Sequence, residues 1–237
     1  MIPTRDRLIL ALDVPTAKQA RALVEDLGDT VTFYKIGLEL FLSGAYFELA
    51  DWLREREKRV FADLKLFDVP QTVASATAQL RRRDVDYVTV HGNDAILRAA
   101  VEAAEGALGI LAVTVLTSLD RADMEDLGFR TDVSSVVLSR ARRAEQIGCA
   151  GVIASGREAE PIRDAVRDEF RIVVPGIRAA AVAGSDDQKR TVDVEEAFRL
   201  GADHIVMGRP IRAAADPAAA AAEVRRIRDE TKYPMQG

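Results

Sequence analysis

The amino-acid sequence predicts a single-domain (β/α)8 TIM barrel of the α/β class. Its 237 residues are close to the length of about 250 that is typical of such a barrel. Eight short runs rich in Val, Ile and Leu recur, and most are nearly continuous, as in parallel strands covered on both faces. Amphipathic stretches separate these runs and no low-complexity linker divides the chain, so we expect one domain over residues 1–237.

The expected strands alternate with segments that carry helix signals at their ends. Three of these segments end on glycine, at Gly28, Gly148 and Gly201, and Asp216 with Pro217 indicates the start of another helix. A doubly wound open sheet is the alternative, but it would more often use fewer strands, and no glycine-rich loop follows the first run. In chain order, the expected strands are 7–13, 31–37, 59–65, 86–92, 109–116, 151–155, 171–176 and 204–209.

Composition narrows the possible partners. A net charge of −5 gives no reason to expect nucleic acid or an anionic membrane surface as the main partner. No apolar stretch approaches the roughly 20 residues of a membrane span. Cys149 is the single cysteine, so no intrachain disulfide can form, and we expect a buried side chain in a cytoplasmic protein.

In a barrel of this kind, function lies where the strands end and the following loops begin. Polar residues at these positions are therefore the candidates for a site. They are Asp13, Lys35, Asp63, Lys65, Asp68, His91, Thr117, Arg178 and Arg209.

Acidic and basic residues alternate at the end of the third expected strand. Asp63 and Lys65 are two residues apart, so their side chains should point the same way, and Lys35 ends the neighbouring strand. We expect these three residues to meet at the mouth of the barrel, either as a catalytic group or as a salt-bridge network that closes it. Asp68 lies just beyond; it is either part of the same group or an N-cap of the next helix, with Gln71 completing a capping box.

This charge pattern suits the loss of an anionic substrate group as neutral gas. Lysines beside carboxylates stay protonated, and a protonated lysine at a reacting carbon can donate a proton. A neighbouring carboxylate fixes the ammonium group and disfavours a second anion. Departure of carbon dioxide would relieve that crowding, so the pattern predicts a decarboxylation site in outline.

The ends of the seventh and eighth expected strands predict a phosphate site. Gly208 would let the backbone approach an anion and Arg209 could bind it with two hydrogen bonds, although a simple turn with a surface arginine is the alternative. The polar segment 178–192 predicts a mobile lid with Gln188 as its contact to substrate; the alternative is an idle surface loop. His91 and His204 form no metal-ligand pattern, and His91 is expected either in the pocket or, more in keeping with a lone histidine, in the core.

Together these motifs resemble the orotidine 5′-phosphate decarboxylase family. The segment DLKLFDVPQT at 63–72 is similar to the signature of that family, and ALD, YKIG, TVLTS, PGIR and MGRPI follow in the family's order over the whole chain. The resemblance implies cofactor-free decarboxylation of orotidine 5′-phosphate to UMP, the last step of de novo pyrimidine nucleotide synthesis. It also implies a homodimer in which Asp68 and Thr72 reach into the partner's site.

The resemblance further implies a role for each site residue. Lys65 would donate the proton to C6, Asp63 would lie beside the substrate carboxylate, and Lys35 and Asp68 would complete the charge array. The implied binding residues are Asp13 and Lys35 for the ribose, Thr117 and Ser118 for the pyrimidine, and Arg178, Gln188, Gly208 and Arg209 for the phosphate.

Two other functions stay open at this point. One is a Mg²⁺-dependent decarboxylase or aldolase of the same superfamily that acts on keto-sugar phosphates, and the other is a barrel that binds phosphate without catalysis. The LFDVPQT continuation and the long segment with Gln188 favour the decarboxylase of orotidine 5′-phosphate.

Overall fold

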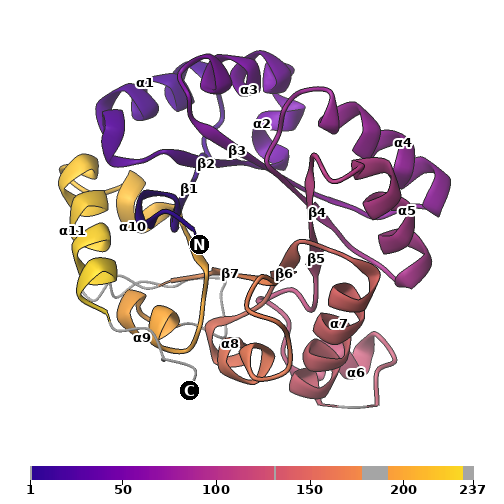
Figure 1. Ribbon diagram of the computed structural model, residues 1–237. Helices are drawn as coiled ribbons and strands as arrows, with labels where there is room; N and C mark the ends of the chain where they lie inside the picture. Colours follow the sequence, from indigo (N-terminus) through magenta and orange to yellow (C-terminus); the bar gives the residue numbers. More distant parts are fainter. Residues whose placement is uncertain (1, 131, 178–191, 232–237) are drawn as a thin grey trace.

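A closed barrel of eight parallel strands forms the centre of the molecule, as predicted (Figure 1). The computed structural model describes residues 2–130, 132–177 and 192–231. Each strand pairs with the next along the chain, and β8 closes the ring by pairing with β1 through Leu8 and Ile205. The strands are β1 Leu8–Ala11, β2 Phe33–Ile36, β3 Arg59–Leu66, β4 Tyr87–Val90, β5 Gly109–Val113, β6 Gly151–Ile153, β7 Arg171–Pro175 and β8 His204–Met207.

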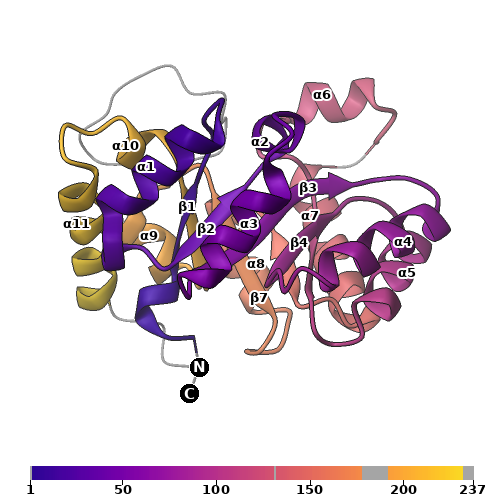
Figure 2. The same ribbon diagram turned by 90° about the horizontal axis from the view of Figure 1, so that it is seen from above.

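Helices surround the barrel, and Figure 2 shows α2, α6 and α10 near the end at which the strands finish. No helix in the described ranges combines the length and apolar character needed to cross a bilayer. The helices are α1 Ala17–Leu27, α2 Leu38–Leu42, α3 Tyr46–Glu55, α4 Pro70–Arg81, α5 Asp94–Ala104, α6 Arg121–Asp126, α7 Val133–Ile147, α8 Gly156–Arg163, α9 Val194–Arg199, α10 Arg209–Arg212 and α11 Pro217–Glu230, with 3-10 turns η1 Thr4–Asp6 and η2 Gly28–Thr30.

The strands are apolar on both faces because each face is covered. Side chains such as Phe33, Phe61 and Leu111 fill the barrel interior, whereas Ala62 and Val88 pack outward into the layer beneath the helices. This two-sided burial explains why the strands appear in the sequence as continuous apolar runs. Cys149 is also buried, with an exposed fraction of 6%. Burial raises the pKa of its thiol to about 12, as expected for a structural residue.

Several helix ends agree with the sequence signals. Gly148 ends α7 in the left-handed conformation at φ 96°, where a side chain would be strained. The Asp216 carboxylate accepts a hydrogen bond from the Ala219 backbone N–H at 2.9 Å and so caps α11, with Pro217 in its first turn.

The capping alternative for Asp68 is wrong. The N-cap of α4 is Val69, which makes no side-chain capping bond, and Gln71 takes part in no capping box. A proline restricts the residue before it to extended conformations, so Pro70 at the first helical position makes Val69 the cap. The Asp68 carboxylate instead accepts a hydrogen bond from the Val69 N–H at 2.6 Å, and the residue is exposed.

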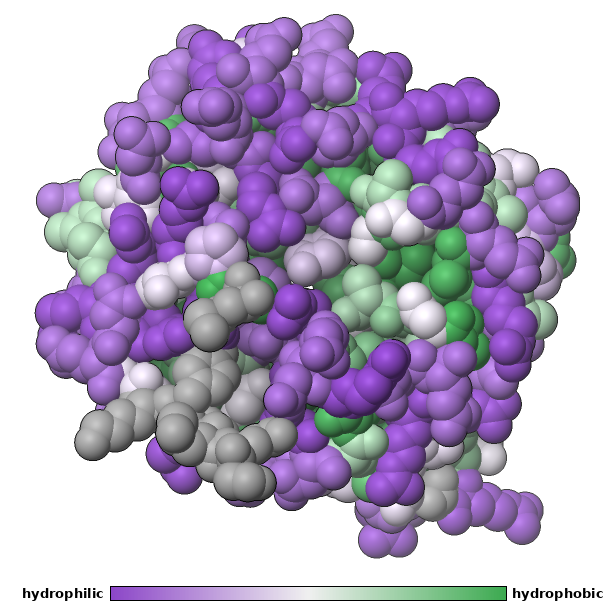
Figure 3. Space-filling model, viewed as in Figure 1, coloured by the Kyte–Doolittle hydropathy of each residue, from purple (hydrophilic) through white to green (hydrophobic). Residues whose placement is uncertain are grey.

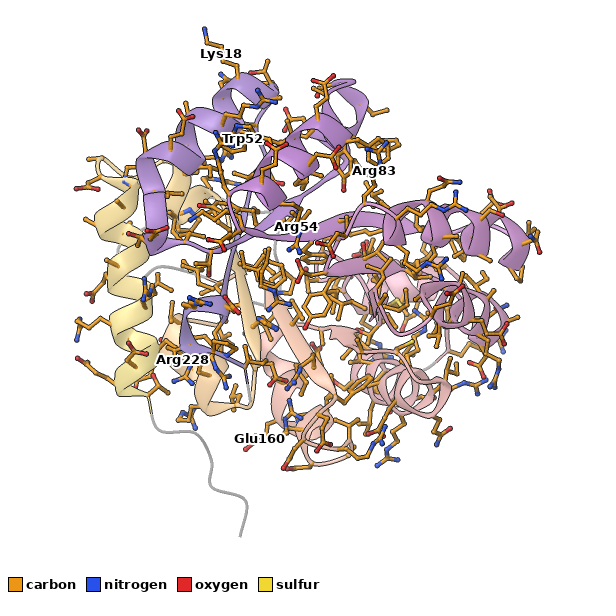
Figure 4. All side chains as sticks on the ribbon, turned by 45° about the horizontal axis from the view of Figure 1, so that its top comes forward. Lys18, Trp52, Arg54, Arg83, Glu160 and Arg228 are labelled. Carbon is orange, nitrogen blue, oxygen red and sulfur yellow. The ribbon has the colours of Figure 1, made fainter. Side chains whose placement is uncertain are left out.

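Charged side chains close the end of the barrel at which the strands begin. Hydrophilic residues cover much of this face (Figure 3), and Figure 4 shows Arg54 pointing from α3 toward the sheet while Lys18 extends from α1 away from the molecule. Asp86 accepts from Arg59 at 2.8 Å and from Arg54 at 3.1 Å. His204 is fully buried above them and its Nδ1 lies 2.8 Å from the Asp6 carbonyl oxygen. These contacts close the end of the barrel at which the strands begin, which we call the floor. The end at which the strands finish is therefore the one available for a site.

Candidate active site

A cavity of about 520 Å³ opens at the carboxyl ends of the strands. This volume lies within the range of about 300–1,000 Å³ that is usual for small-molecule sites. Apolar side chains such as Phe61, Val113 and Val206 form its base. The polar and charged side chains in its wall are Asp13, Lys35, Asp63, Lys65, Thr117, Ser118, Arg209 and Arg212.

Four charged side chains, from β2, from β3 and from the segment after β1, meet in this cavity. The Lys35 ammonium lies 3.1 Å from Asp63 Oδ2 and 3.2 Å from Asp13 Oδ1. The Lys65 ammonium lies 2.8 Å from Asp63 Oδ1. Asp63 therefore sits between two ammonium groups, which is the convergence of Lys35, Asp63 and Lys65 that the sequence predicts.

An irregularity in β3 places Lys65. Between the pairs Ala62–Val88 and Leu66–Val90, β3 has two more residues than β4, and Lys65 adopts φ 47°. The buried Thr89 hydroxyl supports this detour: it accepts from the Lys65 backbone N–H and donates to Asp63 Oδ1, each at 2.9 Å. Lys65 and Asp63 thus meet through a bulge and not through simple strand alternation.

The electrostatics of the cluster keep its buried members charged. Burial alone would lower the pKa of Lys35, but the carboxylates of Asp63 and Asp13 outweigh it, and the pKa lies above the ordinary value. Burial alone would raise the pKa of Asp63, but the ammonium groups of Lys35 and Lys65 outweigh it, and the pKa lies below the ordinary value. The Lys65 side chain is 37% exposed against 12% for Lys35, so Lys65 is the more accessible cation.

Other residues that line the cavity carry hydrogen-bonding groups and guanidinium groups. Thr117 and Ser118 come from the segment after β5, and Gly208 and Arg209 come from the turn into α10. A Cβ atom added at Gly208 would lie 3.6 Å from Asp13 Oδ2, so Gly208 is a close neighbour of Asp13 at the mouth. The cavity therefore combines the lysine–aspartate cluster with hydrogen-bonding groups and arginines.

Not every predicted site residue lies in this cavity. Asp68 and Thr72 are exposed and do not line it. Arg178, Gln188 and the predicted lid segment up to residue 191 lie outside the described residues. The structure thus brings together Asp13, Lys35, Asp63, Lys65, Thr117, Ser118, Gly208 and Arg209.

His91 is not a core residue, nor does it line this cavity. It is half-buried and lines a second hollow of about 800 Å³ beside Phe67, Leu127 and Arg140. Burial, together with the charges of Arg140 and Lys65, lowers the pKa of His91 below its ordinary value. The imidazole is therefore favoured in its neutral form.

Sequence reasoning missed two residues of the site. Thr89 is a lone hydroxyl within an apolar strand, and such a residue signals a buried polar partner. Arg212 lines the cavity one helical turn after Arg209, at the spacing that puts two side chains on one face of a helix. Both signals were present in the sequence, but neither indicates a partner without the fold.

Comparison with known proteins shows the family to which the chain belongs. The model of the orotidine 5'-phosphate decarboxylase / HUMPS family matches residues 6–224. An orotidine 5'-phosphate decarboxylase of Methylococcus capsulatus is 58% identical over 96% of this chain and 94% of its own, and one of Xanthomonas axonopodis pv. citri is 54% identical over 94% of each.

Solved structures agree with these sequence relatives. The crystal structure of orotidine 5'-phosphate decarboxylase from Lactobacillus acidophilus superposes with a TM-score of 0.83 at 30% identity, covering 94% of this chain and 99% of that one. The enzyme from Pyrococcus horikoshii gives 0.76 at 26% identity, covering 94% and 99%. With the family model matching most of its length and with relatives more than half identical, this chain belongs to the orotidine 5'-phosphate decarboxylase / HUMPS family.

Proposed function

We propose that this chain is a carboxy-lyase that decarboxylates orotidine 5′-phosphate to UMP without a cofactor, as the last step of de novo pyrimidine nucleotide synthesis in the cytoplasm. The observation that carries the proposal is the cluster in which Asp63 binds the ammonium groups of both Lys35 and Lys65 within 3.1 Å. Relatives 51–58% identical that are named for this activity support the same reaction.

In the proposed mechanism, Lys65 is the proton donor. The bond between C6 and the carboxylate carbon breaks, carbon dioxide leaves, and the electron pair stays on C6. The Lys65 ammonium stabilises this developing carbanion and then transfers a proton to it, which forms the C6–H bond and leaves a neutral amine that solvent reprotonates. Its 37% exposure supports this role because the more deeply buried Lys35 is held by two carboxylates.

The remaining charges hold the donor and stress the substrate carboxylate. Asp63 accepts from Lys35, Lys65 and Thr89, so its carboxylate is fixed and stays ionised beside the position proposed for the substrate carboxylate. Repulsion between these two anions would be relieved when carbon dioxide leaves. Asp68 would complete the array from a partner subunit.

The binding residues are assigned among the residues that line the cavity. We assign Asp13 and Lys35 to the ribose hydroxyls and Thr117 and Ser118 to the pyrimidine. Gly208 and Arg209 would hold the phosphate, since a guanidinium group can bind phosphate through two hydrogen bonds. Arg178 and Gln188, in the segment that follows β7, are assigned to the phosphate by family resemblance alone.

A homodimer with shared sites is supported by exposed apolar side chains around the mouth. Phe67 and Val69, which flank Asp68, are 69% and 62% exposed, and Leu42 of α2 is 82% exposed. An exposed apolar patch of this kind commonly marks an interface. A partner that covers these side chains would also receive Asp68 and Thr72, which contribute nothing to the cavity of their own chain.

The magnesium-dependent alternative fits the cluster less well. The Lys35 ammonium occupies the position between Asp13 and Asp63 at which a divalent cation would need both carboxylates. In the described ranges, no group of three or more potential metal-ligating side chains is found. The named relatives given above also favour the decarboxylase.

The direct test follows the absorbance of orotidine 5′-phosphate with purified protein treated with EDTA. We expect the absorbance to fall at the same rate with and without EDTA, with UMP as the product. Activity that appears only when Mg²⁺ is restored would favour the keto-sugar phosphate enzyme. Binding of UMP without any turnover would favour the barrel that binds phosphate and catalyses nothing.

A further inference from the structure

Helix α10 brings a second arginine into the cavity. Arg209 and Arg212 stand at its two ends, three residues apart, and both line the cavity wall. This spacing puts side chains on the same face of a helix, about 5–6 Å apart at Cβ. Both guanidinium groups therefore belong to the end of the cavity at which the phosphate is proposed to bind.

The Arg212 side chain has an unsatisfied donor in the described ranges. Its Nε is buried without a hydrogen-bond acceptor, and no carboxylate there forms an ion pair with its guanidinium group. By contrast, Arg226 on α11 is held by both Glu223 and Glu230. A buried donor on a charged group is costly to leave unsatisfied, so an arginine placed in a cavity wall in this state indicates a ligand as its partner.

The charge balance of the cavity gives an independent reason. Lys35 and Lys65 are balanced by Asp13 and Asp63, so the cluster of four is neutral as a whole. In the described part of the cavity no other carboxylate lines the wall, so none there offsets the charge of Arg212. A phosphate monoester carries a charge of about −1.5 to −2 at pH 7, so its oxygens can accept from more than one guanidinium group.

We propose that Arg212 is a further substrate-binding arginine, which adds to the phosphate contact assigned to Arg209 and favours the dianionic form of a phosphate monoester. This inference rests on the proposed function, because it takes the phosphate of the nucleotide as the ligand. Arg212 would donate from its Nε and one terminal nitrogen to two phosphate oxygens, which satisfies the buried donor. The base and ribose would be unaffected by this contact.

The test measures calorimetric binding of UMP and uridine to the wild-type protein and to the Arg212→Gln variant. We expect UMP to bind about 10- to 100-fold more weakly to the variant, as for a lost charge-assisted contact, and uridine to bind equally to both. Arg212→Lys should recover part of the loss because it keeps the charge but not the two-pronged geometry. Arg226→Gln removes the same charge from the surface of α11 and should change neither affinity.

A pH series sharpens the test. Since the second phosphate pKa is about 6, UMP binding to the wild type should strengthen from pH 5 to pH 7, and this gain should be smaller in Arg212→Gln. Unchanged UMP affinity in the variant, or an equal loss for uridine, would overturn the inference while leaving the proposed function intact. A wild-type protein that binds UMP no better than uridine would overturn both.

Discussion

Asp63 is the residue that keeps positive and negative side chains alternating in the site. It accepts hydrogen bonds from two ammonium groups and from Thr89, and its side chain is only 13% exposed. Breaking a buried ion pair by removing one partner is costly, so the cluster acts as a unit. Its order explains why the two lysines can lie so close together at the mouth of the barrel.

Arg209 gives a prediction at the phosphate end. The Arg209→Ala variant should lose about 10- to 150-fold in kcat/KM for orotidine 5′-phosphate, because a charge-assisted contact contributes about 1.5–3 kcal/mol. Steady-state kinetics measure this loss. Orotidine, which lacks the phosphate, should show no such difference between the variant and the wild type. An unchanged kcat/KM would mean that the phosphate binds elsewhere.

Some of these residues can be recognised in the sequence from their place at the end of a strand. Others cannot, because their contacts form only in the folded chain. Lys35, Asp63 and Lys65 are recognisable because each ends an apolar run, and parallel strands bring such ends together. Thr89 and Arg212 gain their meaning from contacts across the fold, with partners in another strand or in no described residue at all. A single sequence does not give those distances.

At the scale of elements, strands and long helices were predicted well, and irregular turns were not. The predicted strand 7–13 contains the observed strand Leu8–Ala11. Its remaining residues, at positions 7, 12 and 13, lie just before and just after that strand. The bulge in β3 is invisible in the sequence because Lys65 at φ 47° has no residue-type signal. The role of Val69 as N-cap instead of Asp68 depends on the strain that Pro70 imposes, which outweighs the capping preference of an aspartate.

Thr89 provides a prediction for the β3–β4 pair. Thr89→Val should lower the free energy of unfolding by about 1–3 kcal/mol, since it leaves the Lys65 N–H and one Asp63 interaction unsatisfied. It should also lower kcat, because Lys65 loses its fixed position. Denaturant unfolding and steady-state kinetics measure the two effects. Thr89→Ser keeps the hydroxyl and is the matched control; equal stability of the Val and wild-type proteins would contradict this account of the bulge.

At the scale of the whole molecule, the two ends of the barrel carry charges for different purposes. At the end where the strands begin, Asp86 forms ion pairs with Arg54 and Arg59, and His204 is buried. At the end where the strands finish, charged side chains surround a cavity. Alternating strands and helices made the closed barrel predictable. The apolar side chains that stay exposed were not predictable from the residues alone, because the exposure of Phe67 or Leu42 appears only in the folded chain.

The burial of His204 predicts that the free energy of unfolding decreases at acidic pH. Burial is the main reason that its pKa is lowered to about 3, and the charges of Arg59, Arg171 and Arg7 add to it. Between pH 6.5 and pH 3 the unfolded chain binds a proton that the folded chain does not, so stability falls with falling pH by up to about 1.4 kcal/mol per unit from this group. His204→Gln should flatten the slope between pH 6 and pH 4.5.

Denaturant unfolding at fixed protein concentration measures that slope. The control is His91→Gln, which changes the other histidine of the chain. Because His91 is only half-buried, its replacement should alter the slope less than that of His204. A slope in His204→Gln as steep as in the wild type would show that another group controls the acid response.

The proposal of a site shared between two subunits predicts that activity returns when two inactive variants are mixed. In a heterodimer of Lys65→Ala and Asp68→Ala subunits, one site has both Lys65 and a partner Asp68, whereas the other has neither. If equal amounts are mixed and re-equilibrated, about half of the dimers are mixed and half of their sites work, so about a quarter of wild-type activity should return. Each variant alone should be nearly inactive. No recovery after proven subunit exchange would argue against a shared site.

The most direct measurement of the central claim is kcat for orotidine 5′-phosphate in Lys65→Ala. Removing the proton donor should lower kcat by at least about 10²- to 10⁴-fold, while UMP binding and the unfolding transition show an intact fold. Lys18→Ala, on the exposed surface of α1, should keep wild-type kcat. Retention of most of the activity by Lys65→Ala would contradict the account, since no other ammonium in the described cavity is as open to a substrate.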